Sequence, residues 1–432
     1  MRTTHLDNFA GMWNSTPPAL RVHGSSAFLR AGDRLARIDL DPARVAWTAE
    51  RSPLRFMPGH PPPRCIQAFG GELWTDGNVV AELLAAPEGG MTVSARDAAT
   101  GRRLWDRLIP APDPAGWAEP EPAWPGAPTE EIDAFLADVP EALVACLSRT
   151  TRRSGMAGNG IEVLTLPPFA CQLDAMRLDP LTGRDLWRAT YPAVHVGIGE
   201  RPRFRGLWAT GNRIGRIDLG SGTNAFHHEA PYRYGWPVLS GSAFAAPWHS
   251  PSRAGVDWVD ESGRLLRSAS WPLKGVRSTM LHPVDAGLVV QTNDQRLWLV
   301  GDEDAPLWDV RARPYICGVH QRGSLPVFVG TDGGGGRLLG FDLATGAELL
   351  NLRPSIGGVG QIEKVPGHPV LVARYAVSRS WHRAARLLLL DMRTLEHELP
   401  IDCVHLLGTW EHGAVCLVGD RVSVLDARPQ PS

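Results

Sequence analysis

The chain has 432 residues and a formal net charge of −2 at pH 7, so no strong electrostatic attraction to nucleic acid or anionic lipid is expected. Its 46 glycines and 37 prolines favour many turns and few long helices. No run of about 18 apolar residues occurs, and residues 1–7 lack the apolar core of a signal peptide. We therefore expect a cytoplasmic protein that interacts with neither membranes nor nucleic acid.

A short segment recurs along the chain: an apolar run, an Asp, a tight turn, and usually an aromatic residue or Leu eight positions after the Asp. The clearest copy runs from Ala95 through Asp97, Thr100 and Gly101 to Trp105. The Asp residues of the series are Asp39, Asp97, Asp179, Asp218, Asp260, Asp302, Asp342, Asp391 and Asp426. Six of the eight gaps between them measure 35 to 49 residues. Such a period with β-type segments predicts the four-stranded blades of a β-propeller.

The turn chemistry explains the recurring residues. Asp accepts hydrogen bonds from the amides just after it, and Gly adopts a positive φ without a Cβ clash. The aromatic residue then lies on the following strand, and we expect Trp47, Trp105 and Trp187 to pack between neighbouring blades. Apolar runs next to seven of the Asp residues predict strands at Leu35–Leu40, Met91–Ala95, Ile214–Leu219, Leu297–Val300, Leu338–Phe341, Leu387–Leu390 and Val422–Leu425.

The period is interrupted between Asp97 and Asp179. Residues 110–128 contain seven prolines and no strand pattern. Thr129 is placed to cap a short helix reaching Ala137, because residues 132, 135 and 136 are apolar and share one helical face. We interpret residues 111–140 as a Pro-rich insertion with a short helix, which serves either as a partner site or as a cap over the scaffold.

The two chain ends complement each other. The chain finishes soon after Asp426 without a following outer strand, and a segment near Leu6–Trp13 could supply that strand and cover an exposed edge. We therefore predict that residues 1–432 form a single β-propeller. Eight blades are the usual number in the family that the repeat resembles, whereas the Asp turns count nine, so nine blades stay possible.

The repeat Ala95-x-Asp97-x-x-Thr100-Gly101-x-x-x-Trp105 resembles the tryptophan-docking repeat of the PQQ-like (quinoprotein-type) β-propeller superfamily. Residues 177–187 carry a similar copy, and degenerate copies cover most of the chain. The resemblance implies an all-β propeller fold. That superfamily includes quinone-dependent alcohol dehydrogenases and assembly scaffolds of the bacterial envelope, so the fold alone does not define an activity.

The residues that the dehydrogenase branch uses are not recognisable here. The resemblance would require adjacent cysteines, a calcium-like ion and a catalytic Asp, but the six cysteines are scattered without a CxxC pair. Buried reduced thiols are the expected state of these cysteines. The run Gly333–Gly336 lacks a following Lys-Ser/Thr and indicates a hairpin tip, and the acidic residues 302–304 indicate a solvated turn. We assign no catalytic residue, no cofactor and no metal ligand.

Aromatic residues outside the repeat register mark possible contact surfaces. These are Tyr232, Arg233, Tyr234 and Trp236, and in the insertion Trp117 and Trp124. Tyr, Trp and Arg are enriched at protein interfaces, although packing against neighbouring loops explains them equally simply. The preferred hypothesis is a non-enzymatic scaffold or recognition module that binds a protein or peptide partner through its rim and inserted loop. The alternatives are a quinone- or small-molecule-binding enzyme and a recognition component of a bacterial defence or conflict system.

Overall fold

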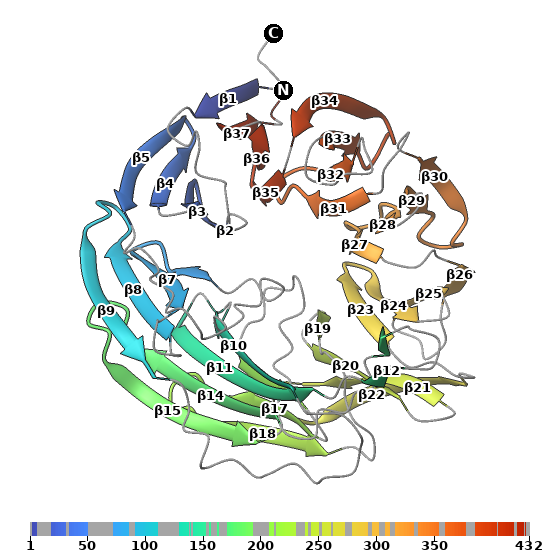
Figure 1. Ribbon diagram of the computed structural model, residues 1–432. Coiled ribbons are helices and arrows are strands. Elements are labelled where there is room, and N and C mark those ends of the chain that lie inside the picture. Colours follow the sequence, from blue (N-terminus) through green and yellow to red (C-terminus); the bar gives the residue numbers. More distant parts are fainter. Residues whose placement is uncertain are drawn as a thin grey trace. The chain divides into compact units, whose positions relative to one another are not determined.

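The computed structural model shows a chain built from antiparallel β-sheets (Figure 1). In the part of the chain that it describes, no helix is present. The residues described are 2–6, 19–31, 34–50, 72–85, 91–110, 129–137, 139, 141–152, 155–156, 162–163, 171–192, 207–210, 213–229, 238–240, 243–249, 253–260, 262–272, 279–292, 296–301, 307–311, 316–331, 336–353, 359–376, 385–403, 405–418, 421–426 and 428.

The first sheets along the chain are meanders in which consecutive strands pair. The first has β2 (Ala19–His23), β3 (Ser26–Ala31), β4 (Arg34–Leu40) and β5 (Ala43–Glu50). The second has β6 (Leu73–Thr75), β7 (Val79–Ala85), β8 (Met91–Asp97) and β9 (Arg103–Ile109). The third has β10 (Thr129–Leu136), β11 (Leu143–Arg152), β14 (Cys171–Leu178) and β15 (Asp185–Pro192), and the fourth has β16 (Leu207–Thr210), β17 (Arg213–Ile217) and β18 (Asn224–Glu229). The short strands β12 (Gly155–Met156) and β13 (Glu162–Val163) form a separate pair.

The later sheets repeat the pattern. They are β19 (Val238–Ser240), β20 (Ala243–His249), β21 (Arg253–Val259) and β22 (Leu265–Pro272); then β23 (Thr279–Val284), β24 (Gly287–Thr292), β25 (Arg296–Val300) and β26 (Trp308–Arg311). Next come β27 (Ile316–His320), β28 (Val327–Thr331), β29 (Leu338–Phe341) and β30 (Glu348–Leu352); then β31 (Val359–Lys364), β32 (Val370–Ala376), β33 (Ala385–Asp391) and β34 (His397–Cys403). The last sheet has β35 (His405–Trp410), β36 (Gly413–Val418), β37 (Arg421–Asp426) and β1 (Arg2–Leu6).

Strands fully occupy six of the seven apolar runs that we named, and in the seventh, Ile214–Leu219, the strand β17 ends at Ile217. Within the described residues, nine sheets of three or four strands follow one another, the same number as the Asp turns. The number of blades, eight or nine, stays a prediction.

Contacts between residues divide the chain into two compact units. Unit 1 comprises Met1–Arg51, Val238–Trp258 and Leu266–Ser432, and unit 2 comprises Ser52–Pro237 and Val259–Leu265.

The short helix predicted from Thr129 to Ala137 is wrong, because β10 occupies Thr129–Leu136 and pairs with β11. The apolar residues of β10 alternate between two cores. Ala134 and Leu136 lie in one hydrophobic cluster, whereas Phe135 and Ala137 lie in another. A strand buried on both faces shows a continuous apolar run, which sequence periodicity cannot distinguish from a helix. Residues 129–136 therefore belong to a sheet, and residues 111–128 of the predicted insertion lie outside the described residues.

An N-terminal segment completes the last sheet as predicted, but the strand lies at Arg2–Leu6 and not at the predicted Leu6–Trp13, of which only Leu6 is among the described residues. In unit 1, β1 runs antiparallel to β37, with Arg2 opposite Asp426 and Leu6 opposite Val422 (Figure 1). The His5 Nδ1 and Ser423 Oγ atoms are 2.8 Å apart, within hydrogen-bonding distance. The edge of β37 is thus covered by the first strand of the chain.

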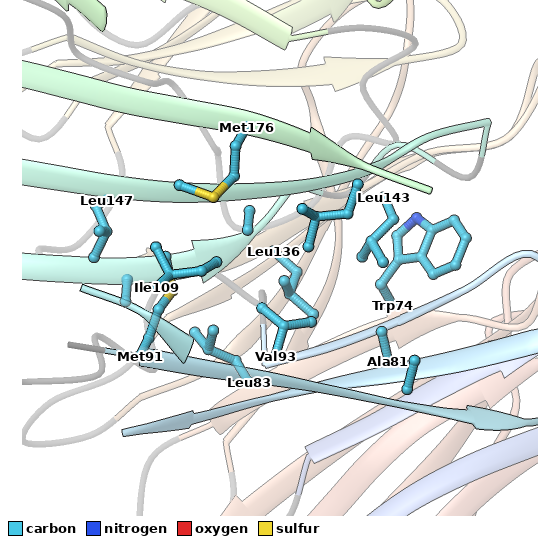
Figure 2. Close-up of a cluster of buried hydrophobic side chains, with 14 of the residues drawn as sticks. Trp74, Ala81, Leu83, Met91, Val93, Ile109, Leu136, Leu143, Leu147 and Met176 are labelled. Atoms are coloured by element: carbon cyan, nitrogen blue, oxygen red, sulfur yellow. The ribbon is translucent and has the colours of Figure 1, made fainter. Parts of the chain in front are cut away.

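Buried side chains form separate clusters between consecutive sheets. In unit 2, Trp74, Leu83 and Val93 of the sheet β6–β9 face Leu143 and Met176 of the sheet β10–β15 (Figure 2). In unit 1, five such clusters lie between successive sheets from β19–β22 onward, and one of them joins the last sheet to β2–β5. Face-to-face packing of successive sheets is the arrangement that the repeat predicts for propeller blades.

Candidate functional site

The Asp turn has the same hydrogen bonds in its well-formed copies. In the turn at Asp97, the Oδ1 atom accepts from Thr100 N (2.8 Å) and Thr100 Oγ1 (2.7 Å), and Gly101 N donates to Asp97 O (2.9 Å). The turn at Asp342 repeats this set with Thr345 N (2.9 Å) and Thr345 Oγ1 (2.7 Å). Hydrogen bonds from Thr345 lower the pKa of Asp342 below its ordinary value. The carboxylate is therefore the form that stabilises the turn.

Each of three tryptophans docks onto the Asp turn of the next sheet. The Trp308 indole Nε1 donates to Leu343 O (3.0 Å), one residue after Asp342, and its ring lies against Gly346. A Cβ added to Gly346 would lie 2.8 Å from Trp308 Cγ, and its φ is +69°. Only Gly is compatible with both the close approach and this backbone conformation. The same contact recurs for Trp105 with Gly183 and for Trp187 with Gly222.

The predicted packing of tryptophans between sheets is confirmed for Trp105 and Trp187. Trp47 contacts Phe28 of its own sheet, with ring centroids 6.3 Å apart. In the turn after Asp391, Leu395 has a φ of 61° at the position, four residues after the Asp, that Gly holds in the turns of Asp97, Asp179, Asp218 and Asp342. The preceding sheet there presents Leu350 instead of a Trp, and both leucines border one hydrophobic cluster. Gly is therefore required where a tryptophan docks, and a larger residue is accepted where none does.

The predicted partner surfaces cannot be placed in the structure. Tyr232, Arg233, Tyr234 and Trp236 lie outside the described residues, and so do Trp117 and Trp124. Those six residues stay a prediction from the sequence.

A row of linked hairpin turns forms a polar surface in unit 1. We define the turn row as residues 285–286, 321–325, 364–368 and 411–412, which belong to the β23–β24, β27–β28, β31–β32 and β35–β36 turns. In an antiparallel meander the first and third turns lie at the same end of the sheet. In the sheet β31–β34, for example, Met392 N in the third turn donates to Pro369 O in the first turn (2.8 Å), so these two turns are neighbours.

Asp285 connects the first three turns of the row. Its Oδ2 atom accepts from Gly323 N (2.9 Å), and its Oδ1 atom lies 3.7 Å from Lys364 Nζ. Gln321, which is 1% exposed, fixes the middle turn from inside. Its Oε1 accepts from Ala286 N (3.1 Å), and its Nε2 donates to Leu325 O (3.2 Å). A buried amide with several partners holds these turns in one arrangement.

The last two turns of the row are joined in a different way. Gly367 N donates to Glu411 O (3.0 Å), and the rings of His368 and His412 approach each other edge to face. The row therefore presents fixed groups of both charges, with Asp285, Lys364 and Glu411 exposed. This arrangement suits recognition of a polar surface, because charged groups of both signs are held in linked turns.

Within the described ranges, no group of three or more His, Cys, Asp or Glu residues is placed to hold a metal ion. Cys146, Cys403 and Cys416 are buried and free. Burial raises the pKa of the Cys146 thiol, which makes that side chain a core residue and not a nucleophile. Nor does any described helix have the length and apolar character to cross a membrane.

The turn row was missed in the sequence because its contacts join residues from different sheets. Asp285 and Gly323 are 38 residues apart, and His368 and His412 are 44 apart. Both separations are close to one repeat period. Aligning the repeats on their first hairpin turn would have brought these polar residues together.

Known structures share the fold at very low sequence identity. A structure titled as the eukaryotic initiation factor matches with a TM-score of 0.52 and 11% identity, covering 92% of this chain and 90% of that one. BamB from Moraxella catarrhalis matches with a TM-score of 0.46 and 11% identity over 87% of this chain and 96% of its own. Sqt1 from Saccharomyces cerevisiae matches with a TM-score of 0.46 and 10% identity, covering 86% of this chain and 95% of its own.

These likenesses concern the fold alone. Together with the meander sheets and the clusters between them, the match with the initiation-factor structure identifies the chain as a β-propeller protein. No family model matches the sequence. No curated protein matches it either.

Proposed function

We propose that this chain is a non-enzymatic, cytoplasmic recognition propeller of the PQQ-like type, spanning residues 1–432, which binds a protein or peptide partner through the turn row. The supporting observation is that Asp285, Gln321 and Lys364 tie three separate turns into one polar surface. A rigid, pre-organised surface binds with less loss of conformational entropy than free loops would. The segments 111–128 and 232–236 are a second proposed contact region, because they carry the interface-type residues noted in the sequence.

The mixture of charges indicates the kind of partner. Asp285 and Glu411 lie in the first and last turns of the row, and Arg322 and Lys364 lie in the two turns between them. A partner segment with both acidic and basic side chains would complement such a surface, whereas a uniformly charged polymer would meet repulsion at two of the four turns. We therefore propose a mixed-charge protein or peptide segment as the ligand.

The experiment is site-specific photo-cross-linking in cells. A photoreactive amino acid replaces Arg322 in one variant and Glu411 in another, and the control variant carries it at Thr48, an exposed residue of the outer strand β5. We expect the two turn-row variants to give the same cross-linked protein and the Thr48 variant not to give it. Adding Lys364→Glu should reduce the yield of that product severalfold. Equal products from all three positions, or none from the turn row, would contradict the proposal.

A further inference from the structure

Two histidines of the turn row face each other across a sheet boundary in unit 1. His368 lies in the β31–β32 turn and His412 in the β35–β36 turn. The His368 Nε2 and His412 Nδ1 atoms are 3.4 Å apart, and the two rings are inclined by 67°. Each nitrogen thus points towards the other from a different sheet.

The separation fits metal chelation better than a direct hydrogen bond. Zn²⁺ binds imidazole nitrogen at about 2.0–2.1 Å with tetrahedral angles, which places two ligand nitrogens about 3.3–3.4 Å apart. Hydrogen bonds from N–H groups cluster instead at about 2.9–3.0 Å. The observed 3.4 Å matches the first distance.

The surrounding contacts hold the two imidazoles in place before any ion binds. Gly367 N donates to Glu411 O (3.0 Å), so the residues immediately before the two histidines are already tied together. A Cβ at Gly367 would collide with that same carbonyl oxygen, which shows how closely the turns approach. The Trp410 ring packs against His412 at 74° with centroids 5.2 Å apart. Both histidines are half-buried, so one side of the pair faces solvent.

Negative charge lies beside the pair. Glu411 directly precedes His412, and its side chain is exposed. A neighbouring carboxylate favours the binding of a cation.

We propose that His368 Nε2 and His412 Nδ1 together bind one divalent transition-metal ion, with Zn²⁺ as the best fit to their spacing and water in the remaining coordination positions. The ion would join the sheet β31–β34 to the sheet that contains both chain ends. Two protein ligands give a weaker site than the four of a structural zinc centre. This proposal is independent of the partner-binding function, because it needs only the two turns.

The test uses the full chain freed of metal with EDTA and titrated with Zn²⁺ against a chromogenic zinc indicator. The variants are His368→Gln and His412→Gln, and the matched control is His23→Gln, an exposed histidine that precedes the β2–β3 turn. We expect the wild type and the control to bind one more equivalent of Zn²⁺ than either test variant. At a Zn²⁺ concentration ten times the dissociation constant, the equilibrium constant for unfolding should fall about elevenfold in the wild type and the control alone.

Three results would overturn the proposal: no binding to the wild type, the same stoichiometry in all variants, or loss in only one of the two test variants. Should the variants fail to fold, hydrogen exchange on the wild type decides. Zn²⁺ should slow exchange in peptides covering residues 365–369 and 410–413. Unchanged exchange in those peptides would refute the site.

Discussion

Replacing Gly346 by Ala tests whether tryptophan docking, and not merely a positive φ, fixes glycine in the Asp turns. Gly346 has a φ of +69°, and an added Cβ would lie 2.8 Å from Trp308 Cγ and 2.9 Å from Trp308 Cβ. The matched control is Gly323→Ala in another turn of the same sheet. Gly323 has a φ of +53°, and an added Cβ there would have no atom within 4 Å.

The expected magnitudes follow from two separate costs. An L-residue in the left-handed region costs about 1–2 kcal/mol, and both variants carry this cost. Overpacking against a fixed neighbour adds about 1–3 kcal/mol, and only Gly346→Ala carries it. Trp308 is 6% exposed and cannot move away freely, because its Nε1 is hydrogen-bonded to Leu343 O. Gly346→Ala should therefore destabilise the protein by about 2–5 kcal/mol, against about 1–2 kcal/mol for the control.

Urea unfolding followed by tryptophan fluorescence and circular dichroism measures both variants. A double-mutant cycle with Trp308→Ala separates the clash with the indole ring from the remaining cost. In the Trp308→Ala background, which itself costs about 3–5 kcal/mol, the added cost of Gly346→Ala should shrink towards that of the control, because the ring is removed while the Cβ atom of residue 308 remains. The reasoning is refuted by equal destabilisation in Gly346→Ala and Gly323→Ala, or by a coupling energy near zero.

Two further predictions concern charge. Thr345 hydrogen bonds lower the folded-state pKa of Asp342, so the stability it contributes is present above the ordinary pKa of 3.8 and is lost as pH falls through the lower folded value. Asp342→Asn should therefore lose less stability than the wild type between about pH 5 and about pH 2 in urea unfolding, and an identical pH profile would contradict this. Arg428 pairs with Asp41 (2.8 Å) and Asp426 (2.5 Å), but all three side chains are partly exposed. Arg428→Gln should cause only a small loss of stability at low salt, and the loss should largely disappear in 1 M NaCl; a salt-independent loss would exclude the ion pairs as its cause.

The repeat turns could be predicted because their chemistry is local. Asp97, Thr100 and Gly101 make their hydrogen bonds within five residues, so the motif can be recognised in the sequence without knowing the neighbours. The eight-residue offset also placed Trp105 and Trp187 correctly, because the offset follows from one short turn and half a strand. Local hydrogen bonding and strand alternation are properties that a single sequence records.

The error at Thr129–Ala137 has a specific physical origin. The run Ile132–Leu136 has apolar residues at helical spacing, but Phe135 and Leu136 enter different cores on opposite faces of β10. Which faces are covered depends on the neighbouring sheets, and these are known only once the fold is assembled. Burial on both sides thus removed the alternation that marks a half-exposed strand.

The turn row could not be predicted for a related reason. Asp285 and Lys364 belong to sheets that are separated in sequence by the sheet β27–β30, and they form their pair only because the packing of the sheets brings their turns together. The position of each turn is set by the packing of whole sheets. Sequence analysis can find such a surface only by comparing equivalent positions in successive repeats, as with His368 and His412.

The pairing of β1 with β37 has a consequence for synthesis on the ribosome. Residues 2–6 are synthesised long before their partner strand at residues 421–426. The last sheet therefore cannot be completed until residues 421–426 have left the ribosome, and β1 lacks its partner strand until then. A change that hinders the pairing of β1 with β37 would therefore affect a late step of folding more than any earlier one.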